Sequence, residues 1–89
     1  MTLRIRTIGQ GPPVALALDG RLTGDEVAEL RRAIDEIGGE VLLDLAGLQF
    51  ADRPGVSALR ELKAQGVRIA GASPYITLLL GEASNGAAN

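Results

Sequence analysis

Residues 41–56 of the chain read Val41-Leu42-Leu43-Asp44-Leu45-Ala46-Gly47-Leu48-Gln49-Phe50-Ala51-Asp52-Arg53-Pro54-Gly55-Val56. The run at residues 40–45 is short and mostly apolar, which is typical of a central strand covered by helices. An amphipathic helix is predicted over about residues 52–65, because apolar side chains recur there every three or four positions. Asp52 can cap this helix, and Pro54 is acceptable in its first turn, where backbone N–H groups lack a helical partner in any case. The segment therefore predicts a buried strand that leads into a helix with an exposed N-terminus.

A strand hairpin and a first helix are predicted before this segment. Residues 3–6 alternate apolar side chains with arginines, and residues 14–18 resume the alternation after a turn rich in glycine and proline. The apolar spacing then changes to three and four residues, which indicates an amphipathic helix. Thr23 or Asp25 can cap its start, and Gly38-Gly39 ends it. The apolar positions of this helix are Val27, Leu30, Ile34 and Ile37.

A further strand, a short helix and a tail are predicted after the segment. Residues 67–70 alternate again, and Ser73-Pro74 places a capping hydroxyl before a proline at the first helical position. A short helix cannot bury all three consecutive leucines at residues 78–80, so we expect an exposed apolar patch there. Residues 81–89 are mostly small or polar, and we expect them to form a flexible tail beyond a domain of residues 1–80.

The predicted order is β-β-α-β-α-β-α, an α/β fold with a mixed four-stranded sheet. Strand–helix–strand crossovers are right-handed, so the helices should lie mainly on one face of the sheet. The other face should be partly open, with arginines and small residues on it. We interpret the arginines as aliphatic stems lying over small side chains, and an anion-binding stripe is the alternative. The residues of this face are Arg4, Arg6, Ala15, Ala17 and Arg68.

The composition excludes several classes of function. The 89 residues include no cysteine and no histidine, which removes thiolate zinc sites, thiol nucleophiles and the commonest general base. Ser57 and Ser73 have no such partner, so we expect neither enzymatic activity nor a cofactor. The net charge of −2 offers no excess of cations to nucleic acid. No apolar run is long enough to span a bilayer, and we expect a cytoplasmic location without membrane insertion.

The turn after the buried strand carries the most functional information. Free N–H groups and the helix dipole make the start of a helix attractive to an anion or an acidic partner. A capped connection with no other role is the alternative. The carboxylates at the ends of predicted elements, Asp19, Asp44 and Asp52, could gather around Mg²⁺. Capping and turn roles explain them more simply, so we expect no metal site.

The chain contains, in order, the groups Leu18-Asp19-Gly20-Arg21-Leu22-Thr23, Leu43-Asp44-Leu45-Ala46-Gly47-Leu48, Phe50-Ala51-Asp52 with Gly55-Val56, and Ala72-Ser73-Pro74. Together they resemble the STAS domain of the anti-sigma factor antagonist family, over about residues 2–80. The resemblance implies a single-layer β-α superhelix that binds a protein partner, often an anti-sigma factor of the switch-kinase type. In the family, that kinase phosphorylates a Ser or Thr in an Asp-Ser-Ser-Gly turn and the complex dissociates.

The chain departs from this family at the phosphorylated turn. Arg53 and Pro54 stand between Asp52 and Gly55, so we expect no phosphorylation at the family position. A cation there has the opposite sign to a phosphate, and we expect Arg53 to pair with a carboxylate of the partner. Ser57, the nearby hydroxyl, is interpreted as an ordinary residue of the first turns of the helix. The predicted partner-binding residues are Asp52, Arg53, Pro54, Gly55, Val56 and Arg60.

Two classes of partner remain open, because the sequence does not separate them. The first is an anti-sigma factor or switch kinase. The second is a transporter ATPase, as in a lipid-transporting ABC complex, or a stressosome-like assembly, to which the chain would be an accessory subunit. Loss of the phosphoacceptor hydroxyls favours the second, since a constitutive subunit needs no switch. A weak homodimer through residues 78–80 is a further expectation.

Overall fold

The computed structural model describes residues 3–81, so the expected tail at residues 81–89 lies outside the described residues except for Gly81. The described chain forms three helices and one mixed sheet of five strands. The elements follow in the order β1 (Leu3–Gln10), β2 (Val14–Leu22), α1 (Gly24–Ile37), β3 (Val41–Asp44), β4 (Leu48–Ala51), α2 (Arg53–Ala64), β5 (Arg68–Ala70) and α3 (Pro74–Leu79).

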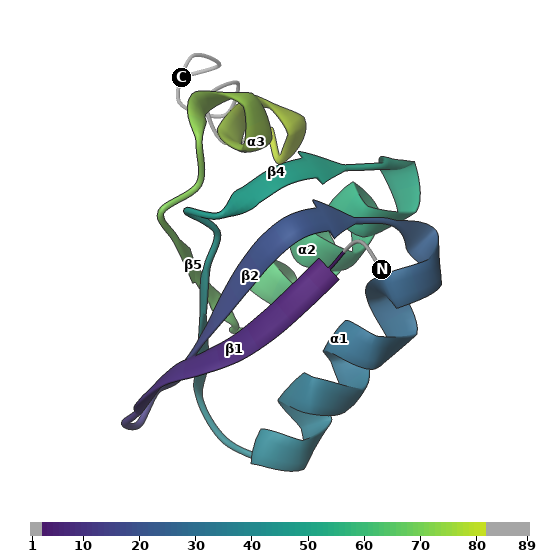
Figure 1. Ribbon diagram of the computed structural model, residues 1–89. Helices are drawn as coiled ribbons and strands as arrows, with labels where there is room; N and C mark the ends of the chain where they lie inside the picture. Colours follow the sequence, from purple (N-terminus) through teal and green to yellow (C-terminus); the bar gives the residue numbers. More distant parts are fainter. Residues whose placement is uncertain (1–2, 82–89) are drawn as a thin grey trace.

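The sheet has the order β1-β2-β3-β5, and β4 pairs with the far end of β2 (Figure 1). β1 and β2 form the antiparallel hairpin that the alternation predicts. The pairs of β2 with β3, β2 with β4 and β3 with β5 are parallel. The α/β class and the mixed sheet are therefore confirmed.

The number of strands is five, and the prediction of four was wrong because it placed β4 in a connection. β3 pairs with the first half of β2. After β3 the chain turns away and then comes back as β4, which lies along the same edge of β2. The Gly20 N–H donates to the Gly47 carbonyl at 2.9 Å, and β4 then pairs with the end of β2 from Gly20 to Leu22. β2 is long enough to pair with two short strands in succession. Such long-range pairing is not visible in a pattern of four residues.

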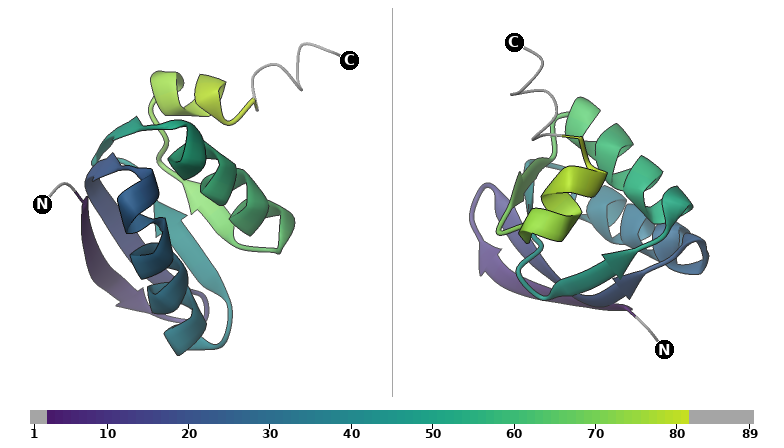
Figure 2. Two further views of the ribbon diagram at one scale, coloured as in Figure 1. Left: turned by 90° about the vertical axis from the view of Figure 1, so that its right-hand side faces the viewer. Right: turned by 90° about the horizontal axis from the view of Figure 1, so that it is seen from above.

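α1 and α2 lie side by side over one face of the sheet, and an ion pair between Arg31 and Glu61 links them (Figure 2). α3 packs against β4. The core between the helices and the sheet is aliphatic, because the sequence has only two aromatic residues to contribute. No helix in residues 3–81 has the length and apolar character needed to cross a bilayer. The largest fully buried side chains are Leu18, Leu22, Leu30, Leu43, Leu45, Leu59, Ile76 and Val41.

The helix ends follow the predicted capping residues. Thr23 is the extended N-cap of α1, and its N–H donates to the Glu26 side chain at 3.3 Å. Gly38 ends α1 at φ 71°, a left-handed conformation that glycine adopts without strain. The Ser73 hydroxyl accepts a hydrogen bond from the Ile76 N–H at 3.2 Å and caps α3.

The structure has the expected exposed apolar patch near the end of the domain, and Leu80 is not part of it. Leu78 is 63% exposed, whereas Leu80 is 5% exposed and belongs to the core. Tyr75, on the same helix, is 46% exposed. The patch therefore consists of Leu78 and Tyr75, with Leu79 partly buried against the core. Self-association through it stays a prediction.

Candidate functional site

The predicted partner-binding turn begins where β2 and β4 end next to each other. Leu22 pairs with Ala51 in the sheet, and the Asp52 N–H donates to the Leu22 carbonyl at 3.1 Å. α1 starts two residues after Leu22 and α2 starts two residues after Ala51. The N-termini of the two helices are consequently neighbours. We call residues 52–56 at this place the α2 corner.

Asp52 joins the two helix starts through its carboxylate. Its Oδ1 accepts a hydrogen bond from the Gly55 N–H of α2 at 2.8 Å, and its Oδ2 accepts one from the Gly24 N–H of α1 at 3.0 Å. The predicted N-cap is therefore confirmed, and the same side chain also serves the neighbouring helix. Both carboxylate oxygens are used inside the chain, so Asp52 is a positioning residue of the corner.

Gly55 and Pro54 hold the corner against the rest of the fold. Gly55 is buried, and a Cβ at this position would lie 2.4 Å from the Leu22 carbonyl oxygen. The ring of Pro54 lies over Gly24, where a Cβ would meet the Pro54 Cβ at 3.3 Å. The close approach that Gly55 permits is thus to β2 of the same chain. Gly55 thus has an internal packing role, and its contact with a partner stays a prediction.

Two backbone amides of the first turn are satisfied internally. Gly55 donates to the Asp52 carboxylate, and the Val56 N–H donates to the Asp52 carbonyl at 2.8 Å. Pro54 has no N–H to offer. The N–H groups of Gly55 and Val56 are therefore not available to a bound anion, and the anion-binding interpretation of this helix start stays a prediction.

Arg53, Pro54 and Arg60 are the exposed members of the predicted set, and Val56 is half-buried. Arg53 and Arg60 lie two helical turns apart, so they share a face of α2 with the exposed Ser57 between them. Within residues 3–81, Arg53 makes no ion pair. Its guanidinium is free to form the bidentate contact with a carboxylate that arginine geometry favours.

Arg21 and Phe50 were not predicted as site residues, yet they lie beside the corner. They pair across β2 and β4, and the Arg21 guanidinium carbon is 4.5 Å from the centroid of the Phe50 ring. The cation–π contact with Phe50 positions the exposed Arg21 side chain next to Leu22, the last residue of β2. No local signal identifies this pair, because it depends on the pairing of β4 with the distant end of β2.

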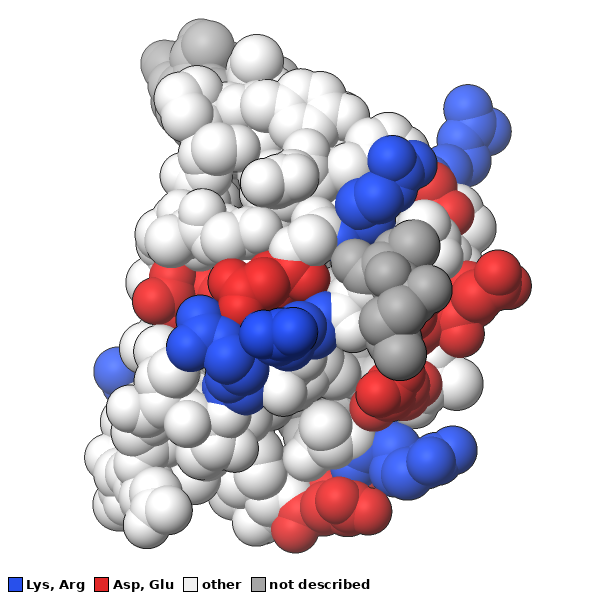
Figure 3. Space-filling view, in the orientation of Figure 1, with Lys and Arg blue, Asp and Glu red and all other residues white. Residues whose placement is uncertain are grey.

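The open face of the sheet carries charges of both signs (Figure 3). Arg6 Nε donates to Asp19 Oδ2 at 2.7 Å. In the sheet register, Asp19 lies opposite Arg4 and Asp44 lies opposite Ala17. Two carboxylates therefore lie on the face that was predicted to be rich in arginine. The hydrogen bond from Arg6 lowers the pKa of Asp19, and the same bond raises the pKa of Arg6. A purely cationic anion-binding stripe is therefore not what the chain builds.

The three aspartates weighed as Mg²⁺ ligands have separate roles in the protein. Asp52 caps α2, Asp19 pairs with Arg6, and Asp44 Oδ1 accepts a hydrogen bond from the Ala46 N–H at 3.0 Å. In the part of the chain that the structure describes, no group of three or more acidic side chains is placed to hold a metal ion. The capping and turn interpretation describes Asp52 and Asp44, whereas Asp19 forms an ion pair on the sheet.

Comparisons with known proteins agree with this architecture. The family model described as "Mlab, STAS domain" matches residues 5–77. Among solved structures, the chain is similar to an antisigma-factor antagonist, a STAS domain from Rhodobacter sphaeroides, with a TM-score of 0.58 and 20% identity. That similarity covers 79% of this chain and 87% of the other, and it shows a common fold. The comparison with curated proteins gives no match.

Proposed function

The chain belongs to the STAS domain family, and from this premise we propose that it is a cytoplasmic regulatory protein that binds a protein partner through the α2 corner. The partner is an anti-sigma factor or switch kinase, so the chain acts as an anti-sigma factor antagonist. It works by binding and catalyses no reaction. The observation that carries the proposal is the exposure of Arg53 and Pro54 on a turn whose other residues are fixed from inside.

The partner is bound without a phosphorylation switch at this turn. The resemblance stated above places the phosphoacceptor hydroxyl between Asp52 and Gly55, where this chain has Arg53 and Pro54. Phosphorylation would add about two negative charges, whereas Arg53 adds a positive one. A carboxylate on the partner is the complement of Arg53, and Arg60 extends the same exposed face.

A second function is favoured by the same substitution. A subunit that stays in its complex has no use for a hydroxyl that controls dissociation. Neither Arg53 nor Pro54 has a hydroxyl, which supports a role as a constitutive accessory subunit of an ABC transporter or a stressosome-like assembly. The same corner would then contact the ATPase or the assembly.

Affinity capture from extract of the source organism tests the proposal. The tagged chain is compared with Arg53→Glu and with Arg68→Glu, which reverses an exposed charge on β5. We expect one partner, identified by mass spectrometry, to be retained by the wild type and by Arg68→Glu and lost with Arg53→Glu. A switch kinase supports the first function, and a transporter ATPase supports the second. A partner retained equally by all three proteins would contradict binding through the corner.

A further inference from the structure

β1 is an edge strand of the sheet. Within residues 3–81 it pairs with β2 alone, so its other side carries backbone groups without a strand partner. The pairing with β2 is regular from Leu3 to Thr7, and a bulge follows between Thr7 and Gly9. Residues 3–7 therefore form a short, regular edge to which another extended segment can add.

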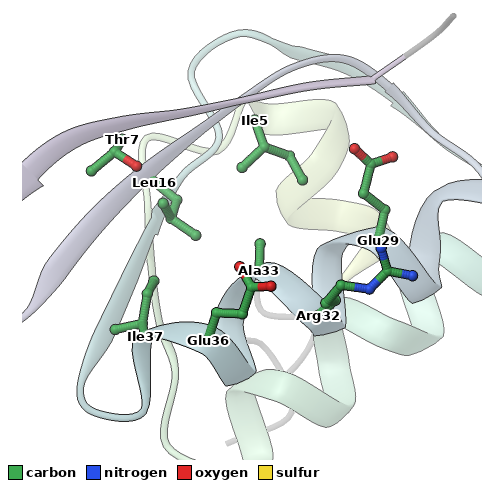
Figure 4. Close-up of a pocket in the computed structure, with 8 residues that line it drawn as sticks. All are labelled: Ile5, Thr7, Leu16, Glu29, Arg32, Ala33, Glu36 and Ile37. Atoms are coloured by element: carbon green, nitrogen blue, oxygen red, sulfur yellow. The ribbon is translucent and has the colours of Figure 1, made fainter.

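A groove of about 470 Å³ runs beneath this edge, between the hairpin and α1 (Figure 4). Ile5 and Thr7 of β1 point from above toward α1, and Ala33 and Ile37 of α1 lie opposite them. Leu16 of β2 closes the groove on the sheet side. The lining is mixed: four of its residues are apolar, and the other four, Thr7, Glu29, Arg32 and Glu36, are polar or charged.

We propose that the β1 edge binds an extended segment of a partner protein as a sixth strand. In such binding, main-chain hydrogen bonds supply affinity and pockets for alternate side chains supply specificity. Alternate apolar side chains of the segment enter the groove beside Ile5 and Thr7. The side chains between them lie on the open face of the sheet, because successive residues of a strand point to opposite faces.

The charges of β1 select acidic residues at those intervening positions. Arg4 and Arg6 both lie on the open face, opposite Asp19 and Ala17. Arg6 is paired with Asp19, whereas Arg4 is exposed and makes no ion pair within the described chain. A carboxylate opposite Arg4 on the added strand would form a favourable cross-strand pair. The occupant is thus an extended segment in which apolar and acidic residues alternate.

A second copy of the chain fits this edge poorly. Any register that puts the apolar residues of a second β1 into the groove puts its arginines on the open face, facing Arg4 and Arg6. Like charges directly opposite each other on a sheet are destabilising. The edge is also separate from the α2 corner in sequence and in the elements that form it, so this inference stands without the proposed function.

A peptide titration of the full chain, followed by NMR of the backbone amides, tests the inference. The probe is a short capped peptide of alternating valine and glutamate, and its control has lysine in place of glutamate. We expect the acidic peptide to shift the resonances of residues 3–7 and of Ala33 and Ile37, and to bind about fivefold more tightly than the lysine peptide. Arg4→Glu should reverse that preference.

Matched substitutions on α1 locate the binding. Ala33→Gln fills the groove and should abolish binding, while Ala28→Gln, at an exposed position of the same helix, should leave it unchanged. Circular dichroism checks that each variant is folded. The inference is overturned if neither peptide binds, if both bind equally, or if the shifts fall on α2 or α3. Self-association that shifts the β1 resonances as the protein is concentrated would overturn it too, because a second copy would be the occupant.

Discussion

Asp52 accepts a hydrogen bond from the Gly24 N–H at 3.0 Å, across 28 positions of the sequence. The same carboxylate caps α2 through Gly55, so one side chain fixes the start of α2 relative to the start of α1. Arg53 follows directly on this fixed point. Arg53 is therefore presented from a fixed backbone, which would lower the entropy lost on binding the proposed partner.

Asp52→Ala should lower the free energy of unfolding by about 2 kcal/mol, because the cap of α2 and the bond to Gly24 are both lost. Asp52→Asn should cost about 1 kcal/mol. Its amide oxygen can still accept from Gly55, but its amide nitrogen faces the Gly24 N–H and cannot accept. Urea unfolding at neutral pH measures both values.

Asp35→Ala is the control for these variants, at an exposed position near the end of α1. It should change stability by less than about 0.5 kcal/mol. If Asp52→Asn were as stable as the wild type, the bond to Gly24 would have no energetic role, and the joint between the helices would have to come from packing alone.

Gly55→Ala should destabilise the fold by about 1–3 kcal/mol, since the added methyl group would lie 2.4 Å from the Leu22 carbonyl oxygen. Gly39→Ala is the matched control, because nothing lies within 4 Å of its Cβ position. That change should stay within about 0.5 kcal/mol. Thermal unfolding of the two variants distinguishes them, and equal melting temperatures would show that α2 can move away from β2 without cost.

The structure follows the sequence closely where local signals act. The caps at Thr23, Asp52 and Ser73 and the stop at Gly38 could all be predicted, because each satisfies backbone groups within a few residues. β4 could not, since its pairing depends on the length of β2, which lies far away in the sequence.

At the candidate site, the sequence could predict which residues form the corner but not which of them face outward. Asp52 serves α1 as well as α2, and Gly55 packs on Leu22, through contacts between distant segments. Those contacts leave Arg53 and Arg60 as the exposed charges of the set. The carboxylates on the open face were missed for a similar reason. Asp19 lies within β2 and Asp44 ends β3, and only the sheet register brings them beside Arg6 and Ala17.

Asp19→Asn should reduce the acid sensitivity of the fold. The hydrogen bond from Arg6 lowers the pKa of Asp19 below its ordinary value of about 3.9. The ionised carboxylate therefore contributes stability above about pH 4, and this contribution is lost as the pH falls through the lower folded pKa. Urea midpoints at pH 7 and in this acidic range measure it. Arg6→Gln should remove the same pH-dependent part of the stability. If the urea midpoints of the wild type and of Asp19→Asn changed with pH in parallel, the pairing would be refuted.

Leu78→Lys should weaken self-association at high protein concentration. Leu78 and Tyr75 are exposed on α3, and residues 69–81 include no charged side chain to oppose contact between two copies. Sedimentation equilibrium compares the variant with the wild type. A wild type that remains monomeric at the highest concentration would remove the expected weak homodimer.

Calorimetric titration of the captured partner with wild type, Arg53→Glu and Arg68→Glu tests the partner-binding corner most directly. Binding through Arg53 and a partner carboxylate predicts that Arg53→Glu weakens affinity by about tenfold or more, because attraction becomes repulsion at a desolvated contact. Arg68→Glu should bind like the wild type. Equal affinity of Arg53→Glu and wild type would place the partner elsewhere on the domain.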